Sequence, residues 1–155
     1  MPIMVNKIEI TDDEVHSEMQ YHSADTLEES RHKAAEALVI RQLFLQEAID
    51  KKLLDSLEEE ASEEEKAIDA LLQQEISMQE ADEENCERYY NQNKERFEDK
   101  KTGKQLPLDS VKNHIYDYLH ARSLQTGINQ YIKLLAGKAR IVGFDMEGSD
   151  NPLVQ

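Results

Sequence analysis

Residues 26–54 carry the pattern that most constrains the fold. Apolar side chains recur there at helical spacing, and between Leu38 and Leu45 they occupy well over half of the helix circumference. A helix with so broad an apolar surface must be covered by more than one neighbouring element. The pattern therefore predicts a central, buried helix that begins at Thr26, with Glu29 completing a capping box.

Both ends of the ordered chain favour β-structure. IMVNKIEI, residues 3–10, predicts two short strands around Asn6-Lys7, and ARIVGFDM, residues 139–146, predicts a terminal strand. Because a two-stranded ribbon is marginal in water, we expect residues 141–144 to pair with residues 4–10 in a three-stranded sheet. The predicted fold class is thus mainly α, a multi-helix core with a small sheet formed by N-terminal and C-terminal strands.

Four further helices are predicted from cap residues that precede apolar residues at helical spacing. The expected caps are Thr11 with Glu14, Ser62, Asp82, and either Asp109 or Ser110. Residues 98–107 contain Gly103 and Pro107 and almost no apolar side chain, which predicts a connector between the last two helices. We expect one domain over residues 1–146 and a flexible tail over residues 147–155.

The charge balance excludes one class of partner. The formal net charge is −15, and the only basic cluster lies in the predicted connector, so a nucleic-acid-binding stripe is absent from the sequence. Residues 55–65 hold seven acidic side chains and no basic one. Two interpretations remain: the segment is a solvated acidic turn, or it attracts basic client polypeptides or a cation.

The sequence also bears on location. The longest apolar runs are too short to span a bilayer, and the first residues have neither a basic region nor an apolar stretch of the kind that leads a chain to secretion. We therefore expect a cytoplasmic protein that does not bind membranes.

Four blocks in register resemble parvulin-type peptidyl-prolyl isomerases. The blocks are VNKIEITDDEV, AAEALVIRQLFLQEAIDKKL, ADEENCERYYNQNKERF and VKNHIYDYLHARSLQTGINQYIKLLAGKARIVGFDM, within residues 4–146. They are most similar to the cytoplasmic nitrogenase-maturation branch and its SurA-like chaperone core. The resemblance implies a helical core that cradles unfolded polypeptide, with the C-terminal helix and strand returning to the N-terminal segment.

The chain departs from that family where the catalytic domain belongs. Relatives carry a parvulin domain after the block that matches Tyr89, Tyr90 and Phe97, whereas this sequence has only the connector 98–107, which is too short to form a domain. The family's paired histidines and glycine-rich turns have no counterpart here. No catalytic residue is assigned, and we expect a chaperone-like or adaptor domain that binds polypeptides.

Aromatic and methionine side chains suit adaptable contacts with a client chain. The predicted client-binding residues are Phe44, Met78, Tyr89, Tyr90, Phe97 and Tyr116. We expect them to line a groove between the central helix and the C-terminal helix. The expected partners are unfolded or extended polypeptides, together with a second copy of the chain in a homodimer formed by segment exchange, because a short hinge favours swapping.

Two other classes of function remain open from the sequence. Glu29-x-x-His32 and Asp117-x-x-His120 match the ligand spacing of carboxylate-bridged di-metal bundles, so an enzyme of that kind, or a cryptic prolyl isomerase, is the main alternative. A purely structural assembly protein is the other. The surroundings of both motifs are typical of solvent-facing helix, and Cys86 has no recognisable catalytic partner, so we expect neither a metal nor a cofactor.

Overall fold

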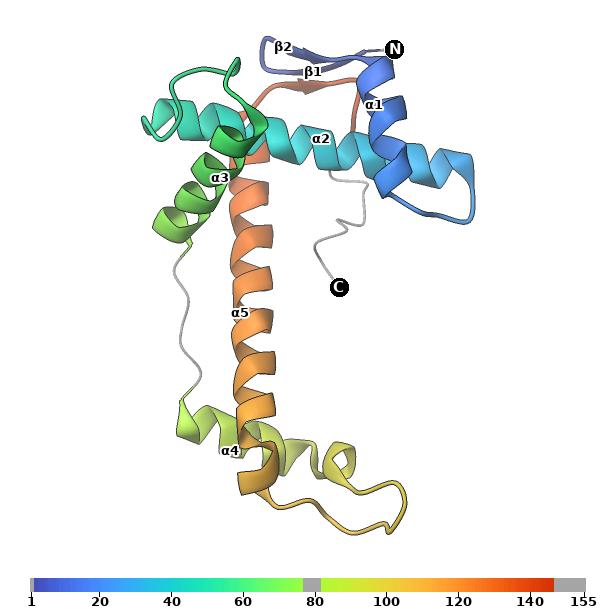
Figure 1. Cartoon of the computed structure of the whole chain (residues 1–155), viewed down its shortest axis with the longest axis vertical. Coiled ribbons are helices and arrows are strands. Elements are labelled where there is room, and N and C mark those ends of the chain that lie inside the picture. Colours follow the sequence, from blue (N-terminus) through green and yellow to red (C-terminus); the bar gives the residue numbers. More distant parts are fainter. Residues whose placement is uncertain (1, 77–81, 147–155) are drawn as a thin grey trace. The chain divides into compact units, whose positions relative to one another are not determined.

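The computed structural model describes residues 2–76 and 82–146 (Figure 1). These residues form two compact units: unit 1 comprises described residues 2–76 and 128–146, and unit 2 comprises residues 82–127. The elements in chain order are β1 (Ile3–Val5), β2 (Ile8–Ile10), α1 (Asp12–Glu18), the 3-10 turn η1 (Met19–Tyr21), α2 (Leu27–Asp50), α3 (Ala61–Glu75), α4 (Glu83–Gln92), the 3-10 turn η2 (Lys94–Phe97), α5 (Leu108–Lys138) and β3 (Ile141–Val142).

The sheet of unit 1 joins the two ends of the described chain, as the sequence predicts. Its strand order is β2-β1-β3, and both pairings are antiparallel, with Ile3 opposite Ile10 and Val5 opposite Ile141. Asn6 turns the chain between β1 and β2 with a φ of 57°, a conformation that asparagine tolerates well. Its side-chain oxygen also accepts a hydrogen bond of 2.9 Å from the Arg140 amide, which fixes β3 beside the turn.

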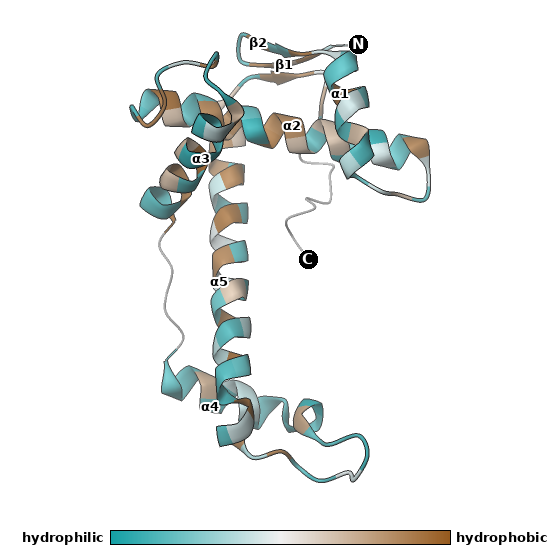
Figure 2. Cartoon of the chain, in the orientation of Figure 1, coloured by the Kyte–Doolittle hydropathy of each residue, from teal (hydrophilic) through white to brown (hydrophobic). Residues whose placement is uncertain are grey.

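Helix α2 is the centre of unit 1, as the breadth of its apolar surface predicts. It contacts α1, η1, α3 and β1, and hydrophobic and hydrophilic residues alternate along its length in Figure 2. Its cap is the predicted one, because the Thr26 hydroxyl accepts a hydrogen bond of 3.1 Å from the Glu29 amide. Among the described residues, eighteen buried side chains form one core around this helix. Their burial stabilises the unit by roughly 25 cal/mol for each Å² of apolar surface removed from water.

The last part of α5 packs on α2 within unit 1. The ring of Phe44 stacks on Tyr131 with 6.2 Å between the centroids, and Ile132 and Leu135 belong to the same core. Burial raises the pKa of the Tyr131 phenol to about 12, with smaller contributions from the carboxylates of Glu47 and Glu75. Buried side chains thus fill the contact between α2 and the last part of α5 around Phe44.

The acidic segment 55–65 is partly neutralised at its end. Ala61 begins α3, and Glu60 is the N-cap residue without a capping side chain, so the prediction that Ser62 caps this helix is wrong. Arg41 of α2 donates to Glu64 at 3.1 Å and to Glu65 at 2.6 Å, which attaches the first turn of α3 to α2.

Unit 2 contains α4, η2 and the first part of α5. The Asp82 carboxylate caps α4 by accepting from the Asn85 amide at 2.8 Å, as predicted. Residues 98–107 form a tight hairpin in which Glu98 bridges Gln105, and Gly103 adopts a φ of 70°. Because α5 begins at Leu108, the prediction that Asp109 or Ser110 caps it is wrong, and the helix begins directly after Pro107.

The central helix ends earlier than its apolar pattern, which runs to residue 54. α1 and α4 each pass into a 3-10 turn, and α2 ends at Asp50, where Lys52 adopts a φ of 63°. The predicted tail, residues 147–155, lies outside the described residues. No helix in the described ranges is long and apolar enough to cross a membrane.

Candidate functional site

A hollow of about 420 Å³ opens to solvent between the α1–η1 segment and α2 in unit 1. More of its lining surface is apolar than polar. The lining residues are Asp13, Glu14, Ser17, Glu18, Gln20, Tyr21 and Leu38. We call this feature the α1 hollow.

The apolar part of the α1 hollow consists of an aromatic ring and an aliphatic side chain. Tyr21 is 73% exposed although tyrosine usually covers apolar surface, and Leu38 of α2 is half-buried at the other side. Leu27, which begins α2 a short loop after Tyr21, is also largely exposed. The connection between η1 and α2 therefore presents large hydrophobic side chains to solvent.

The polar part consists of carboxylates on α1. Asp13 and Glu14 are exposed, and neither forms an ion pair with another residue that the structure describes. The backbone amide of Glu14 donates to the Thr11 hydroxyl at 3.1 Å, which caps α1. Glu14 also lines the hollow. Glu18, by contrast, contacts His22 at 2.7 Å.

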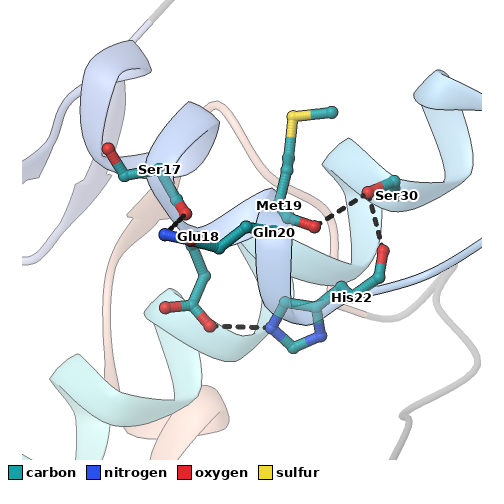
Figure 3. A network of polar contacts seen from close by, with 6 residues as sticks. All are labelled: Ser17, Glu18, Met19, Gln20, His22 and Ser30. Carbon is teal, nitrogen blue, oxygen red and sulfur yellow. Dashed lines mark hydrogen bonds and ion pairs between the residues drawn. The ribbon is translucent and has the colours of Figure 1, made fainter.

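A network of hydrogen bonds holds the turn that carries Tyr21 (Figure 3). The Ser30 hydroxyl of α2 lies 2.7 Å from the His22 carbonyl and 3.4 Å from the Met19 carbonyl, and it can donate to either one. The side-chain Nε2 of Gln20 donates to the Ser17 carbonyl at 2.9 Å. Because Ser30 is buried in α2, the bond from its hydroxyl attaches the end of η1 to the central helix of the unit.

A second group of aromatic side chains lies in unit 2. Tyr90 stacks on Phe97 at 5.5 Å between centroids, and Tyr89 contacts both Phe97 and Tyr118. The Tyr90 hydroxyl donates a short hydrogen bond of 2.6 Å to the Leu106 carbonyl, which ties the hairpin 98–107 to α4. These contacts assign Tyr90 and Phe97 to the core of unit 2.

The five predicted client-binding residues that the structure describes are divided between the two units. Phe44 is 6% exposed in the core of unit 1, whereas Tyr89, Tyr90, Phe97 and Tyr116 belong to unit 2. Tyr116 is the most accessible of these five described residues at 39% exposure, and its ring stacks on His120. Met78 lies outside the described residues.

The metal motifs and the cysteine have ordinary surroundings. His32 stacks on Phe144 at 5.0 Å in unit 1, and the Asp117 motif belongs to unit 2. In the described part of the chain, no three histidine, cysteine or acidic side chains are grouped to hold a metal ion. Cys86 is 1% exposed, and burial raises the pKa of its thiol.

The α1 hollow was missed by the sequence reasoning. Thr11 and Glu14 indicate a helix cap, but nothing in that pattern distinguishes a capping carboxylate from one that faces a hollow. The available signal is the breadth of apolar surface on α2, which includes Leu38, combined with the aromatic residue Tyr21 between the first cap and the central helix.

Comparison with known protein families, with curated proteins and with solved structures gives no match to this chain.

Proposed function

We propose that this chain is a chaperone-like or adaptor domain that binds extended segments of other polypeptides and carries out no covalent chemistry. The observation that carries the proposal is the α1 hollow, an open depression whose lining includes Leu38 and the 73% exposed ring of Tyr21. Burying one large apolar side chain there contributes about 1.5–3 kcal/mol, before the cost of ordering a flexible client is subtracted. Modest affinity and broad tolerance of client sequence follow.

The sheet of unit 1 also supports the proposal. Pairing of β1 with β3 brings the end of α5 back to the N-terminal segment, which is the arrangement that the resemblance to SurA-like cores implies. The hairpin 98–107 stands where relatives carry their catalytic domain, so binding is the part of that family's activity that we transfer to this chain. The second place for client contacts is the exposed side of Tyr116 in unit 2.

An aggregation assay tests this function. A chemically unfolded model enzyme is diluted into buffer with increasing amounts of the chain, and light scattering records its aggregation. We expect the chain to suppress scattering and Tyr21→Gln to weaken this protection, because the substitution removes exposed aromatic surface without disturbing the core. Leu134→Gln is the matched control, since Leu134 is 56% exposed on α5 and does not line the hollow.

Two results would count against the proposal. Absence of protection at several-fold molar excess of the chain contradicts the polypeptide-binding function. Equal loss of protection in Tyr21→Gln and Leu134→Gln contradicts the assignment to the α1 hollow. A prolyl-isomerisation assay on the same preparation distinguishes the isomerase alternative, for which we expect the uncatalysed rate.

A further inference from the structure

The α1 hollow combines an apolar depression with one sign of charge. Tyr21 and Leu38 supply the apolar surface, while Asp13, Glu14 and Glu18 supply carboxylates. Lysine and arginine are absent from its lining among the residues that the structure describes. Arg31 and His22 have acidic partners on α1, because Arg31 contacts Asp12 at 3.4 Å and His22 contacts Glu18 at 2.7 Å.

The carboxylates that remain for an occupant are those of Asp13 and Glu14. Both lie in the first turn of α1, are exposed, and have no ion-pair partner among the described residues. Since the hollow is open to water, the two carboxylates stay hydrated and their charges cost the fold little. Their electrostatic interaction with an approaching ion extends over about 10 Å at 0.1 M salt. They attract a cationic group and repel an anionic one.

We propose that the α1 hollow binds client segments in which a large apolar side chain is flanked by lysine or arginine. This inference rests on the proposed polypeptide-binding function and names the client chemistry for that same site. The apolar side chain of the client packs against Tyr21 and Leu38, and the flanking cations lie against Asp13 and Glu14. The aliphatic stems of lysine and arginine cover apolar surface while their heads reach the carboxylates.

Charge also decides against the other occupants. A second copy of the chain carries a formal net charge of −15, so two copies repel one another at low salt. Nucleic-acid phosphates and anionic lipid surfaces are repelled by the same carboxylates. A basic segment of a different polypeptide is the occupant whose charge complements the hollow.

The test uses the full chain and three synthetic 12-residue peptides that carry the same fluorescent label. The first contains two leucines, one phenylalanine and four lysines, the second has glutamates in place of the lysines, and the third keeps the lysines but has serines in place of the apolar residues. Fluorescence anisotropy gives the Kd of each peptide at low and high salt. We expect only the first peptide to bind well, with its affinity falling as salt rises.

The variants separate the hollow from charge in general. The double substitution Asp13→Asn with Glu14→Gln is expected to weaken binding of the first peptide by roughly fivefold, as removal of exposed ion pairs predicts. The matched control is Asp69→Asn with Glu58→Gln, which changes the net charge equally at two exposed positions away from the hollow. This control is expected to leave the Kd of the first peptide within twofold of the parent value. Because Glu58 belongs to the acidic segment 55–65, the control also tests whether that segment attracts basic clients.

Each failure has a distinct meaning. Equal affinity for the lysine and glutamate peptides, or equal weakening by the two double variants, overturns the inference while the proposed function stands if the chain still suppresses aggregation. Binding of the third peptide as tightly as the first shows charge attraction alone and also overturns it. Failure to bind any peptide together with failure to suppress aggregation overturns the proposed function itself.

Discussion

The two compact units of this chain are stabilised in different ways. Unit 1 buries eighteen side chains that come from both ends of the sequence, including Ile3 at one end and Leu135 at the other. In unit 2, over residues 82–127, the described core has four buried side chains, and hydrogen bonds such as that from Tyr90 to Leu106 supplement it. Unit 1 thus depends on long-range contacts, and unit 2 on a small core within one contiguous segment.

This difference has consequences for folding and for function. A core as small as that of unit 2 is close to the lower limit for independent stability, whereas unit 1 has the larger core. Contiguous contacts form quickly, but pairing β1 with β3 requires almost the whole chain. The proposed binding surface therefore lies in the unit that has the larger core and that depends on contacts between distant parts of the sequence.

The largest expected effects come from truncating one buried side chain in the core of each unit. Leu71→Ala in α3 and Ile115→Ala in α5 remove fully buried side chains, and each costs about 2–5 kcal/mol of unfolding free energy. Because unit 2 has the smaller reserve, we expect Ile115→Ala to deprotect residues 82–127 while unit 1 keeps its protection. Amide hydrogen exchange measured by mass spectrometry on both variants follows the two units separately.

The same experiment tests whether the units unfold independently. Loss of protection throughout both units in each variant would mean one cooperative structure, and the comparison would then have no energetic basis. That result would support the single domain over residues 1–146 that the sequence predicts. Val142→Thr, at an exposed position of β3, is the control that should change neither unit.

A smaller effect is expected from glycines that adopt a positive φ in each unit. Gly143 follows β3 with a φ of 86°, and an added Cβ would lie 2.8 Å from the Pro2 carbonyl oxygen. Gly103, at the tip of the hairpin, has a φ of 70°, but an added Cβ there meets nothing within 4 Å. Gly143→Ala therefore combines backbone strain of about 1–3 kcal/mol with a backbone clash, whereas Gly103→Ala adds strain alone.

Thermal unfolding with proteolysis as a second readout distinguishes these glycine variants. We expect Gly143→Ala to lower the Tm more than Gly103→Ala and to expose the N-terminal strands to protease. A larger loss in Gly103→Ala would show that the hairpin matters more to the fold than the junction of the two chain ends.

Much of the fold could be predicted because its signals are local. The turn at Asn6, the caps at Thr26 and Asp82 and the breadth of apolar surface on α2 each depend on neighbouring residues, and the structure has all of them. Closing the sheet with residues 141–144 was predicted from the marginal stability of a two-stranded ribbon, and the third strand covers Ile141–Val142 of that range. Ser62 failed as a cap because α3 begins one residue before it, after Glu60, although serine is the better capping residue.

The candidate site was less predictable for a physical reason. Aromatic residues occur both in cores and on binding surfaces, so the residue type of Phe44 and Phe97 suits client contact although the structure buries both side chains. The sequence does not single out Tyr21, because its exposure depends on where η1 ends and on how Ser30 holds that end, and both are properties of the tertiary fold. Burial cannot be assigned from residue type alone.

The smallest expected effect concerns one ion pair in each unit. Lys51 holds the pKa of Glu75 below its usual range in unit 1, and Lys112 does the same to Glu83 in unit 2, in both cases mainly through a hydrogen bond to the carboxylate. A lowered folded-state pKa adds stability above the unfolded value of about 4.3, and this stability is lost as the pH falls through the folded pKa. Glu75→Gln and Glu83→Gln should therefore lower the free energy of unfolding slightly at pH 7. Both variants should match the parent chain at pH values below both the folded and the unfolded pKa.

The two variants should differ in the size of this effect. Glu83 is 72% exposed against 24% for Glu75, so solvent screens the Lys112–Glu83 pair more than the Lys51–Glu75 pair. The loss of stability in Glu83→Gln should therefore be the smaller of the two. Urea midpoints at neutral and acid pH measure both effects, and a destabilisation of either variant that persists at acid pH would assign it to packing rather than to charge.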